Sequence, residues 1–140
     1  MTPAALICDT SGLLAFFNDA DHDHQRVVAA VAEATGPLVL SPYVLAELDY
    51  LVASRLGVTA ELAVLEQVWS GAFEFPLIAP SDVRRMASVI SRFSDQQIGL
   101  ADASLVVLAD IYGTTSLLTL DHRHFRVIRP LAAEAFVLLP

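Results

Sequence analysis

A short apolar run that ends in an acid is the most constraining feature of this chain. The run Ala5-Leu6-Ile7-Cys8 is followed at once by Asp9, Thr10 and Ser11, and a second apolar run begins at Leu13. The first run predicts a strand buried on both faces, and the second predicts a helix with Thr10 and Ser11 as capping residues. Asp9 is therefore expected at the carboxyl end of an interior strand, where open α/β sheets bind their ligands. A charge buried there needs a compensating partner, because its desolvation costs several kcal/mol.

The rest of the chain alternates short apolar segments with amphipathic ones. Further strands are expected at residues 38–40, 73–78, 114–120 and 135–139, with Pro76 indicating an edge position for the second of these. Helices are expected at residues 27–34, 42–57, 58–71, from residue 80 onward and at residues 101–109. This order predicts an α/β sandwich with a mostly parallel central sheet, in one domain over residues 1–140.

Composition indicates where the protein acts in the cell and which cysteine chemistry it lacks. No apolar run approaches the roughly 20 residues of a membrane span, and no Lys or Arg precedes the first apolar run, so we expect neither a membrane segment nor a signal peptide. The single cysteine, Cys8, excludes an internal disulfide and a cysteine-rich zinc site. These features favour the cytoplasm. The hydrophobic fraction of 55% is enough to cover both faces of a sheet and a subunit interface.

The charge balance excludes several protein classes. The net charge is −8, and all eight basic residues are arginine. Response-regulator receivers and haloacid-dehalogenase-type phosphatases use a lysine, so the absence of lysine argues against both. An acidic chain that binds nucleic acid needs cations or grouped arginines to offset repulsion by the phosphates. The densest arginine group lies on the helix predicted from residue 80 and contains Arg84, Arg85 and Arg92.

Acids from four distant segments are expected at one edge of the sheet. Asp9 and Asp121 each follow a predicted strand, and Asp102 is the one charge at the start of an apolar helix. The helix that follows strand 38–40 carries Glu47 and Asp49 on opposite sides of its apolar stripe, and periodicity does not say which of the two faces the site.

Clustered carboxylates of this kind favour a hard divalent cation. Like charges at close range repel one another, and Mg²⁺ or Mn²⁺ relieves that repulsion with all-oxygen ligands. Such ions support phosphodiester hydrolysis by polarising a phosphoryl oxygen and activating water. The alternative is a non-catalytic protein-binding module of the same fold in which the acids form a structural cluster. Replacement of Asp9 separates the two alternatives.

Four motifs fall in order along nearly the whole chain, at residues 7–11, 40–48, 99–105 and 118–125. With these motifs the sequence resembles the PIN-domain ribonucleases, specifically the VapC toxins of bacterial type II toxin–antitoxin systems. The resemblance implies a Rossmann-like three-layer sandwich, Mg²⁺- or Mn²⁺-dependent endoribonuclease activity and a homodimer. It also implies a cognate VapB-type antitoxin whose tail enters the active-site groove.

The resemblance also assigns residues to roles. It selects Glu47 over Asp49 and implies four metal ligands, which are Asp9, Glu47, Asp102 and Asp121. Thr10 or Ser11 would orient a carboxylate or a water molecule, and family members vary at the acid that corresponds to Asp121. The resemblance gives no catalytic role to His122 or His124. RNA contacts would fall to the metal and to arginine clusters, namely Arg84, Arg85, Arg92, Arg123 and Arg126.

Overall fold

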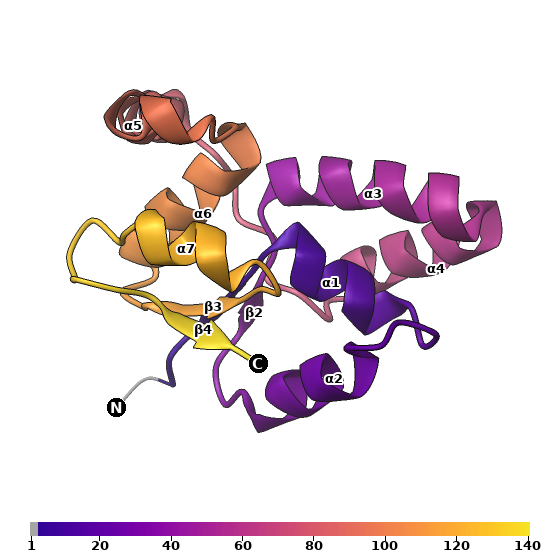
Figure 1. The fold of residues 1–140 in the computed structure, drawn as a ribbon. Coiled ribbons are helices and arrows are strands. Elements are labelled where there is room, and N and C mark those ends of the chain that lie inside the picture. Colours follow the sequence, from indigo (N-terminus) through magenta and orange to yellow (C-terminus); the bar gives the residue numbers. More distant parts are fainter. Residues whose placement is uncertain (1–2) are drawn as a thin grey trace.

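Four short parallel strands form the centre of the molecule in the computed structural model, which describes residues 3–140 (Figure 1). The strands are β1 (Leu6–Cys8), β2 (Leu38–Val39), β3 (Ser116–Leu118) and β4 (Val137–Leu139). Their order in the sheet is β2-β1-β3-β4, and every pairing is parallel. The predicted α/β fold with a parallel central sheet is therefore confirmed.

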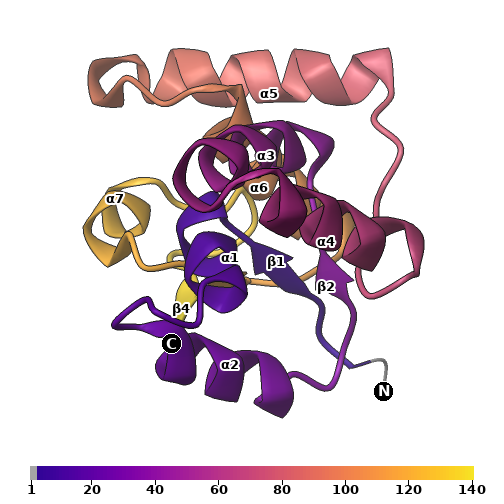
Figure 2. The ribbon, with the colours of Figure 1, turned by 90° about the vertical axis from the view of Figure 1, so that its right-hand side faces the viewer.

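Helices surround the sheet and connect its strands. They are α1 (Thr10–Phe17), α2 (His24–Glu33), α3 (Pro42–Leu56), α4 (Val58–Trp69), α5 (Pro80–Arg92), α6 (Leu100–Ile111) and α7 (His122–Val127), with a 3₁₀ turn η1 (Ser94–Gln96). α5 lies across one end of the molecule, beyond α3 and α6, and α2 lies at the opposite end (Figures 1 and 2). None of the helices within residues 3–140 is long and apolar enough to cross a bilayer.

One predicted strand is absent, and one helix was not predicted. Residues 73–78 form no regular strand, and a single bridge joins Glu74 to Val39. Glu74 donates to Leu38 O and accepts from Leu40 N, but Pro76 has no N–H with which to continue such pairing. Conversely, helix α7 was not predicted, because its six residues are too few to show helical periodicity.

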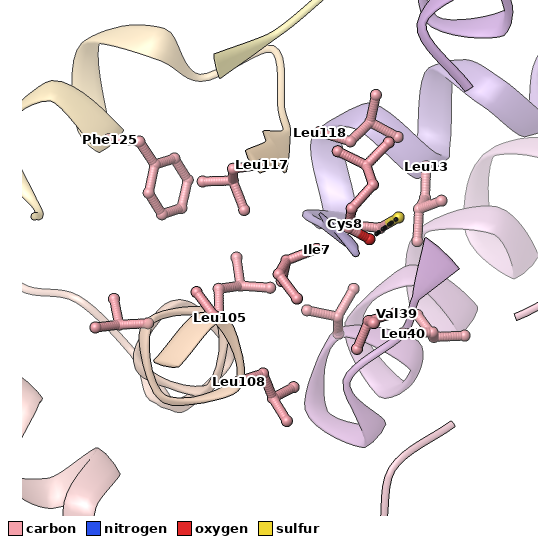
Figure 3. Close-up of a cluster of buried hydrophobic side chains, with 14 of the residues drawn as sticks. Ile7, Cys8, Leu13, Val39, Leu40, Leu105, Leu108, Leu117, Leu118 and Phe125 are labelled. Carbon is pink, nitrogen blue, oxygen red and sulfur yellow. Dashed lines mark hydrogen bonds between the residues drawn. The ribbon is translucent and has the colours of Figure 1, made fainter. Parts of the chain in front are cut away.

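Helix α6 forms the centre of the core beneath the sheet. All residues from 103 to 109 are buried, as the apolar character of this segment predicted. Leu105 and Leu108 point toward Ile7 of β1 (Figure 3). Cys8 is fully buried, and burial raises the pKa of its thiol to about 12. Cys8 is thus a small packing residue.

Gly12 lets α1 approach β3 closely. A Cβ atom at this position would lie 2.9 Å from Leu118 Cγ and 3.0 Å from Leu118 O. We expect Gly12→Ala to cost about 1–3 kcal/mol of stability by overpacking, measured as a lower denaturation midpoint. Gly99→Ala is the comparison, because no atom outside the neighbouring residues of the chain lies within 4 Å of the added methyl group. Equal midpoints for the two variants would contradict this account of the contact.

Candidate active site

The carboxyl edge of the sheet opens into a cavity of about 410 Å³. The chain leaves β1 toward β2 on one side and reaches β3 on the other, so the cavity lies at a switch point of the sheet. Its lining residues are Asp9, Thr10, Ser11, Leu14, Glu47, Leu51, Arg55, Asp102, Asp121 and His124. The structure therefore brings all four predicted acids to one cavity, together with Thr10 and Ser11. Their roles as metal ligands stay a prediction.

Asp9 forms the floor of this cavity. It is 7% exposed, and its Oδ1 accepts a hydrogen bond from Thr10 N at 2.8 Å. Its Oδ2 accepts from Ser11 Oγ at 2.9 Å and from Thr119 Oγ1 at 2.8 Å. Asp9 is itself the N-cap of α1, so the prediction of Thr10 and Ser11 as capping residues was wrong by one position. The acceptor that satisfies the first helical amide is the carboxylate.

Burial controls the charge of Asp9. The pKa of its carboxyl is raised to about 6, because desolvation by burial and the negative charge of Asp102 together outweigh the three hydrogen bonds, which lower it. Without a cation, the ionised form of Asp9 is therefore disfavoured in the folded protein.

Asp102 lies in the first turn of α6, across the cavity from Asp9, and is partly buried. Its Oδ2 lies 3.1 Å from Nε2 of His124 on α7. Burial raises the pKa of Asp102, and the nearby charge of Glu47 adds to the rise, whereas His124 lowers it. Asp102 and His124 thus form a polar pair at the cavity wall that sequence reasoning did not anticipate.

The structure distinguishes Glu47 from Asp49. Glu47, Leu51 and Arg55 line the cavity from one face of α3, at four-residue spacing. Asp49 does not line it. Its Oδ1 is buried without a hydrogen-bond partner, and Asp49 raises the pKa of Glu61 on α4 through a hydrogen bond and its charge. The acid that the resemblance selected is therefore the one at the cavity.

A buried pair of hydroxyls holds the helices that carry Glu47 and Asp102. Ser41 caps α3 by accepting from Tyr43 N, and its Oγ lies 2.7 Å from Ser104 Oγ on α6. Ser104 donates to Ala101 O, which leaves its oxygen to accept the Ser41 proton. This contact positions the two acids relative to each other.

Thr119 is the supporting residue that sequence reasoning missed. It is fully buried just beyond β3, donates to Asp9 Oδ2 and accepts from Asp121 N at 3.0 Å. Ser11 Oγ likewise accepts from Leu120 N at 3.0 Å. The available signal was a hydroxyl two residues before an acid at the end of a strand. These bonds join the turns after β1 and β3 into one unit.

The donor set fits a hard divalent cation. The cavity has four carboxylates, and Thr10 Oγ1 at its wall is buried with no hydrogen-bond partner. Within residues 3–140, no three Asp, Glu, His or Cys side chains are grouped closely enough to hold one ion as they stand. Mg²⁺ does not need such a cage, because it commonly binds one or two carboxylates and keeps several water ligands.

Comparison with known proteins decides the family. The family model described as PIN domain matches residues 6–130. The chain belongs to the PIN-domain family. Ribonuclease VapC26 of Mycobacterium tuberculosis is 47% identical over 135 residues, which cover 96% of this chain and all of that PIN-domain protein. The resemblance predicted from the four motifs is confirmed.

Solved PIN-domain structures share the fold. The crystal structure of VapC20 of Mycobacterium tuberculosis, described as a sarcin–ricin loop cleaving toxin, has a TM-score of 0.80 at 18% identity, covering 94% of this chain and 99% of that one. VapBC2 of Rickettsia felis, solved bound to a DNA fragment from its promoter, has a TM-score of 0.67 at 17% identity and covers 96% of each chain. At these identities the likeness concerns the fold alone.

Removal of the Thr119 hydroxyl tests the support of Asp9. We expect Thr119→Val to lower divalent-metal affinity about 10- to 100-fold, because it leaves Asp9 less firmly oriented. It should also cost about 1–3 kcal/mol of stability, because the buried Asp9 carboxylate loses a donor and the Asp121 amide loses its acceptor. Metal titration by calorimetry and thermal denaturation measure the two effects. Thr119→Ser keeps the hydroxyl and is the control, and equal losses in both variants would argue against a hydrogen-bonding role.

Proposed function

We propose that this chain is a divalent-metal-dependent endoribonuclease and the toxin of a type II toxin–antitoxin system. The observation that carries the proposal is the gathering of four carboxylates from distant segments at one cavity of a PIN domain. The 47% identity to a VapC ribonuclease over almost the whole chain supports it.

In the proposed site, Asp9 and Asp102 are the main ligands of Mg²⁺ or Mn²⁺, and Glu47 and Asp121 complete the acidic set. When bound, the ion polarises a phosphoryl oxygen of RNA and activates a water molecule for attack. Ser11 and Thr119 hold the Asp9 carboxylate in one orientation through its Oδ2 atom. Thr10 also lines the cavity, and in the proposed site Thr10 or Ser11 would orient a carboxylate or a water molecule.

Cleavage of RNA by the purified protein tests this proposal. We expect cleavage with Mg²⁺ or Mn²⁺, none with EDTA, and none in the Asp102→Asn variant. Sequencing of RNA 5′ ends after a short pulse of expression would identify the target and the cleavage site. Cleavage that persists in Asp102→Asn would reject this active site, and absence of cleavage with every divalent ion would favour the non-catalytic binding module.

We also propose a homodimer that is inhibited by a VapB-type antitoxin. The solved VapBC2 complex of Rickettsia felis supports a partner of this type. Exposed large side chains on α3 and α4, Tyr50, Leu62 and Trp69, offer apolar surface for protein contacts.

Because β1 and β4 come from opposite ends of the chain yet share one sheet, residues 1–140 are proposed to form a single PIN domain. With RNA as substrate, the proposed site of action is the cytoplasm.

A further inference from the structure

A second cavity adjoins the acidic one. It has a volume of about 300 Å³ and is lined by Gln96, Asp121, Arg123, His124 and Val127. Asp121 and His124 line both cavities, so the two adjoin at these residues. Together they form a path that starts at Arg55 near the end of α3, crosses the acids and ends at Arg123 on α7.

Arg55 and Arg123 are the basic side chains that line this path. Both are exposed, and neither forms an ion pair within residues 3–140. By contrast, Arg26 pairs with Asp23 and Arg85 pairs with Asp110.

The arginines of α5, which the sequence singled out as a basic group, do not line either cavity. Arg92 of that group lies over the ring of Phe93, with 5.6 Å between its Cζ and the ring centroid. The free positive charge at the acidic site therefore comes from α3 and α7, and not from α5.

An RNA strand at this site needs positive charge on both sides of the acids. The chain carries a net charge of −8, and its carboxylates repel every phosphate that approaches the cavity. A metal ion offsets this repulsion at the reacting phosphate only, so the neighbouring phosphates need other partners. Arg55 lies eight residues beyond Glu47 on the same face of α3, about 12 Å along the helix axis. That separation suits a neighbouring phosphate and not the reacting one.

We propose that Arg55 and Arg123 bind the RNA phosphates on opposite sides of the scissile bond, so that the strand runs across the acids from α3 to α7. This inference rests on the proposed ribonuclease function and assigns its substrate path. The guanidinium group suits this task, because it stays charged and presents paired N–H donors to phosphate oxygens. Both arginines are positioning residues, since neither is placed to act on the reacting phosphate.

Salt-dependent RNA binding tests the path. Arg55→Gln and Arg123→Gln would be compared with Arg26→Gln on α2 and Arg129→Gln just beyond α7, two exposed arginines that line neither cavity. Binding of a fluorescently labelled single-stranded RNA would be measured by anisotropy at several KCl concentrations with Mg²⁺ present, in an Asp102→Asn background that prevents cleavage. We expect each path variant to weaken binding several-fold and to reduce the slope of log K against log salt by about 0.7, the value for one phosphate contact on a single strand.

Steady-state cleavage by the otherwise unmodified protein gives a second measurement. Each path variant should raise KM several-fold with kcat within about twofold of the original, because uniform binding is lost and the reacting groups remain. The control variants should match the original protein in both constants.

The possible outcomes separate this inference from the function on which it rests. If the original protein cleaves RNA and the path variants match the controls in slope and KM, the path is wrong and the ribonuclease proposal stands. If the original protein cleaves no RNA with any divalent ion, both proposals fail. If the path variants bind RNA like the controls but no longer bind the purified antitoxin, the groove is a protein-docking site and the RNA path is rejected.

Discussion

Replacement of Asp9 with Asn is expected to lower metal-dependent RNA cleavage at least about 100-fold. Loss of a residue that merely orients a metal ligand commonly costs 10- to 100-fold in affinity or activity, and Asp9 is proposed as a ligand itself. Asn keeps the shape of the side chain and can still accept from Thr10 N, so the loss would be of charge and not of packing. Initial rates over a range of Mn²⁺ concentrations would measure the effect. Growth inhibition on expression should disappear in parallel.

The same variant should be more stable than the original protein when metal is absent. The pKa of Asp9 is raised from 3.8 to about 6, mainly by burial, so at neutral pH its ionised form costs the fold on the order of 3 kcal/mol. In metal-free protein at a pH between these two pKa values, Asp9 is protonated in the folded state and ionised in the unfolded state. The contribution of Asp9 to the free energy of unfolding is therefore fully present below about pH 4 and is lost as pH rises through about 6.

Thermal denaturation with EDTA across this pH range would show whether the stability of the original protein falls, relative to the variant, as pH rises. The difference in midpoint between Asp9→Asn and the original protein should grow in favour of the variant from pH 4 to pH 7. Addition of Mn²⁺ should raise the midpoint of the original protein and leave the variant nearly unchanged, because only a bound ligand stabilises the fold. A variant that cleaves RNA at the original rate, or that responds equally to Mn²⁺, would show that Asp9 is not a metal ligand.

The second large effect is expected from Glu47→Gln, with Asp49→Asn as its matched partner on the same helix. Glu47 lines the cavity and its charge acts on Asp102, so we expect about a 10- to 100-fold loss of cleavage when it becomes neutral. Asp49 lies outside the cavity lining, and its replacement should leave cleavage within about twofold. Rates at saturating Mn²⁺ for the two variants measure this contrast.

The Asp49→Asn variant also has an expected effect on stability. It removes a charge that raises the pKa of Glu61, and it supplies an amide that can donate to that carboxylate. Denaturation at neutral pH should therefore show that Asp49→Asn is slightly more stable than the original protein. If Asp49→Asn abolished cleavage and Glu47→Gln did not, the assignment of the helix face would be reversed.

The sequence pattern predicted the order of strands and helices better than it predicted individual short elements. The parallel α/β order followed from apolar runs that each end in a polar turn, because both faces of such a sheet are covered by helices. Residues 73–78 had the composition of a strand but form one bridge only, at Glu74. Helix α7 was missed because its six residues are too few to show helical periodicity, although Asp121 caps its start by accepting from His124 N.

The candidate site shows the same division. Asp9 and Asp121 stood out in the sequence because each follows a predicted strand, and Asp102 stood out because it is the one charge at the start of an apolar helix. Thr119 and Arg55 did not stand out, since a hydroxyl within a strand and an arginine near a helix end are ordinary at those places. Thr119 is important because it donates to Asp9, which lies more than 100 residues away in the chain. Arg55 is important because it lines the cavity from α3.

The sequence by itself determined the kind of fold, the family and the acids that mark the site, because these depend on local patterning and on motifs in a set order. Only the tertiary structure decided which face of α3 meets the cavity, that Thr119 and Ser11 hold Asp9, and that Arg55 and Arg123 lie at the two ends of one path. The physical reason is that these side chains meet only when α3, α6 and α7 pack around the sheet. The periodicity of one segment does not specify which other segments pack against it. Asp9 illustrates both parts. Its place at the end of β1 was predicted from ten residues, whereas its raised pKa depends on burial and on groups from two other segments, at Asp102 and Thr119.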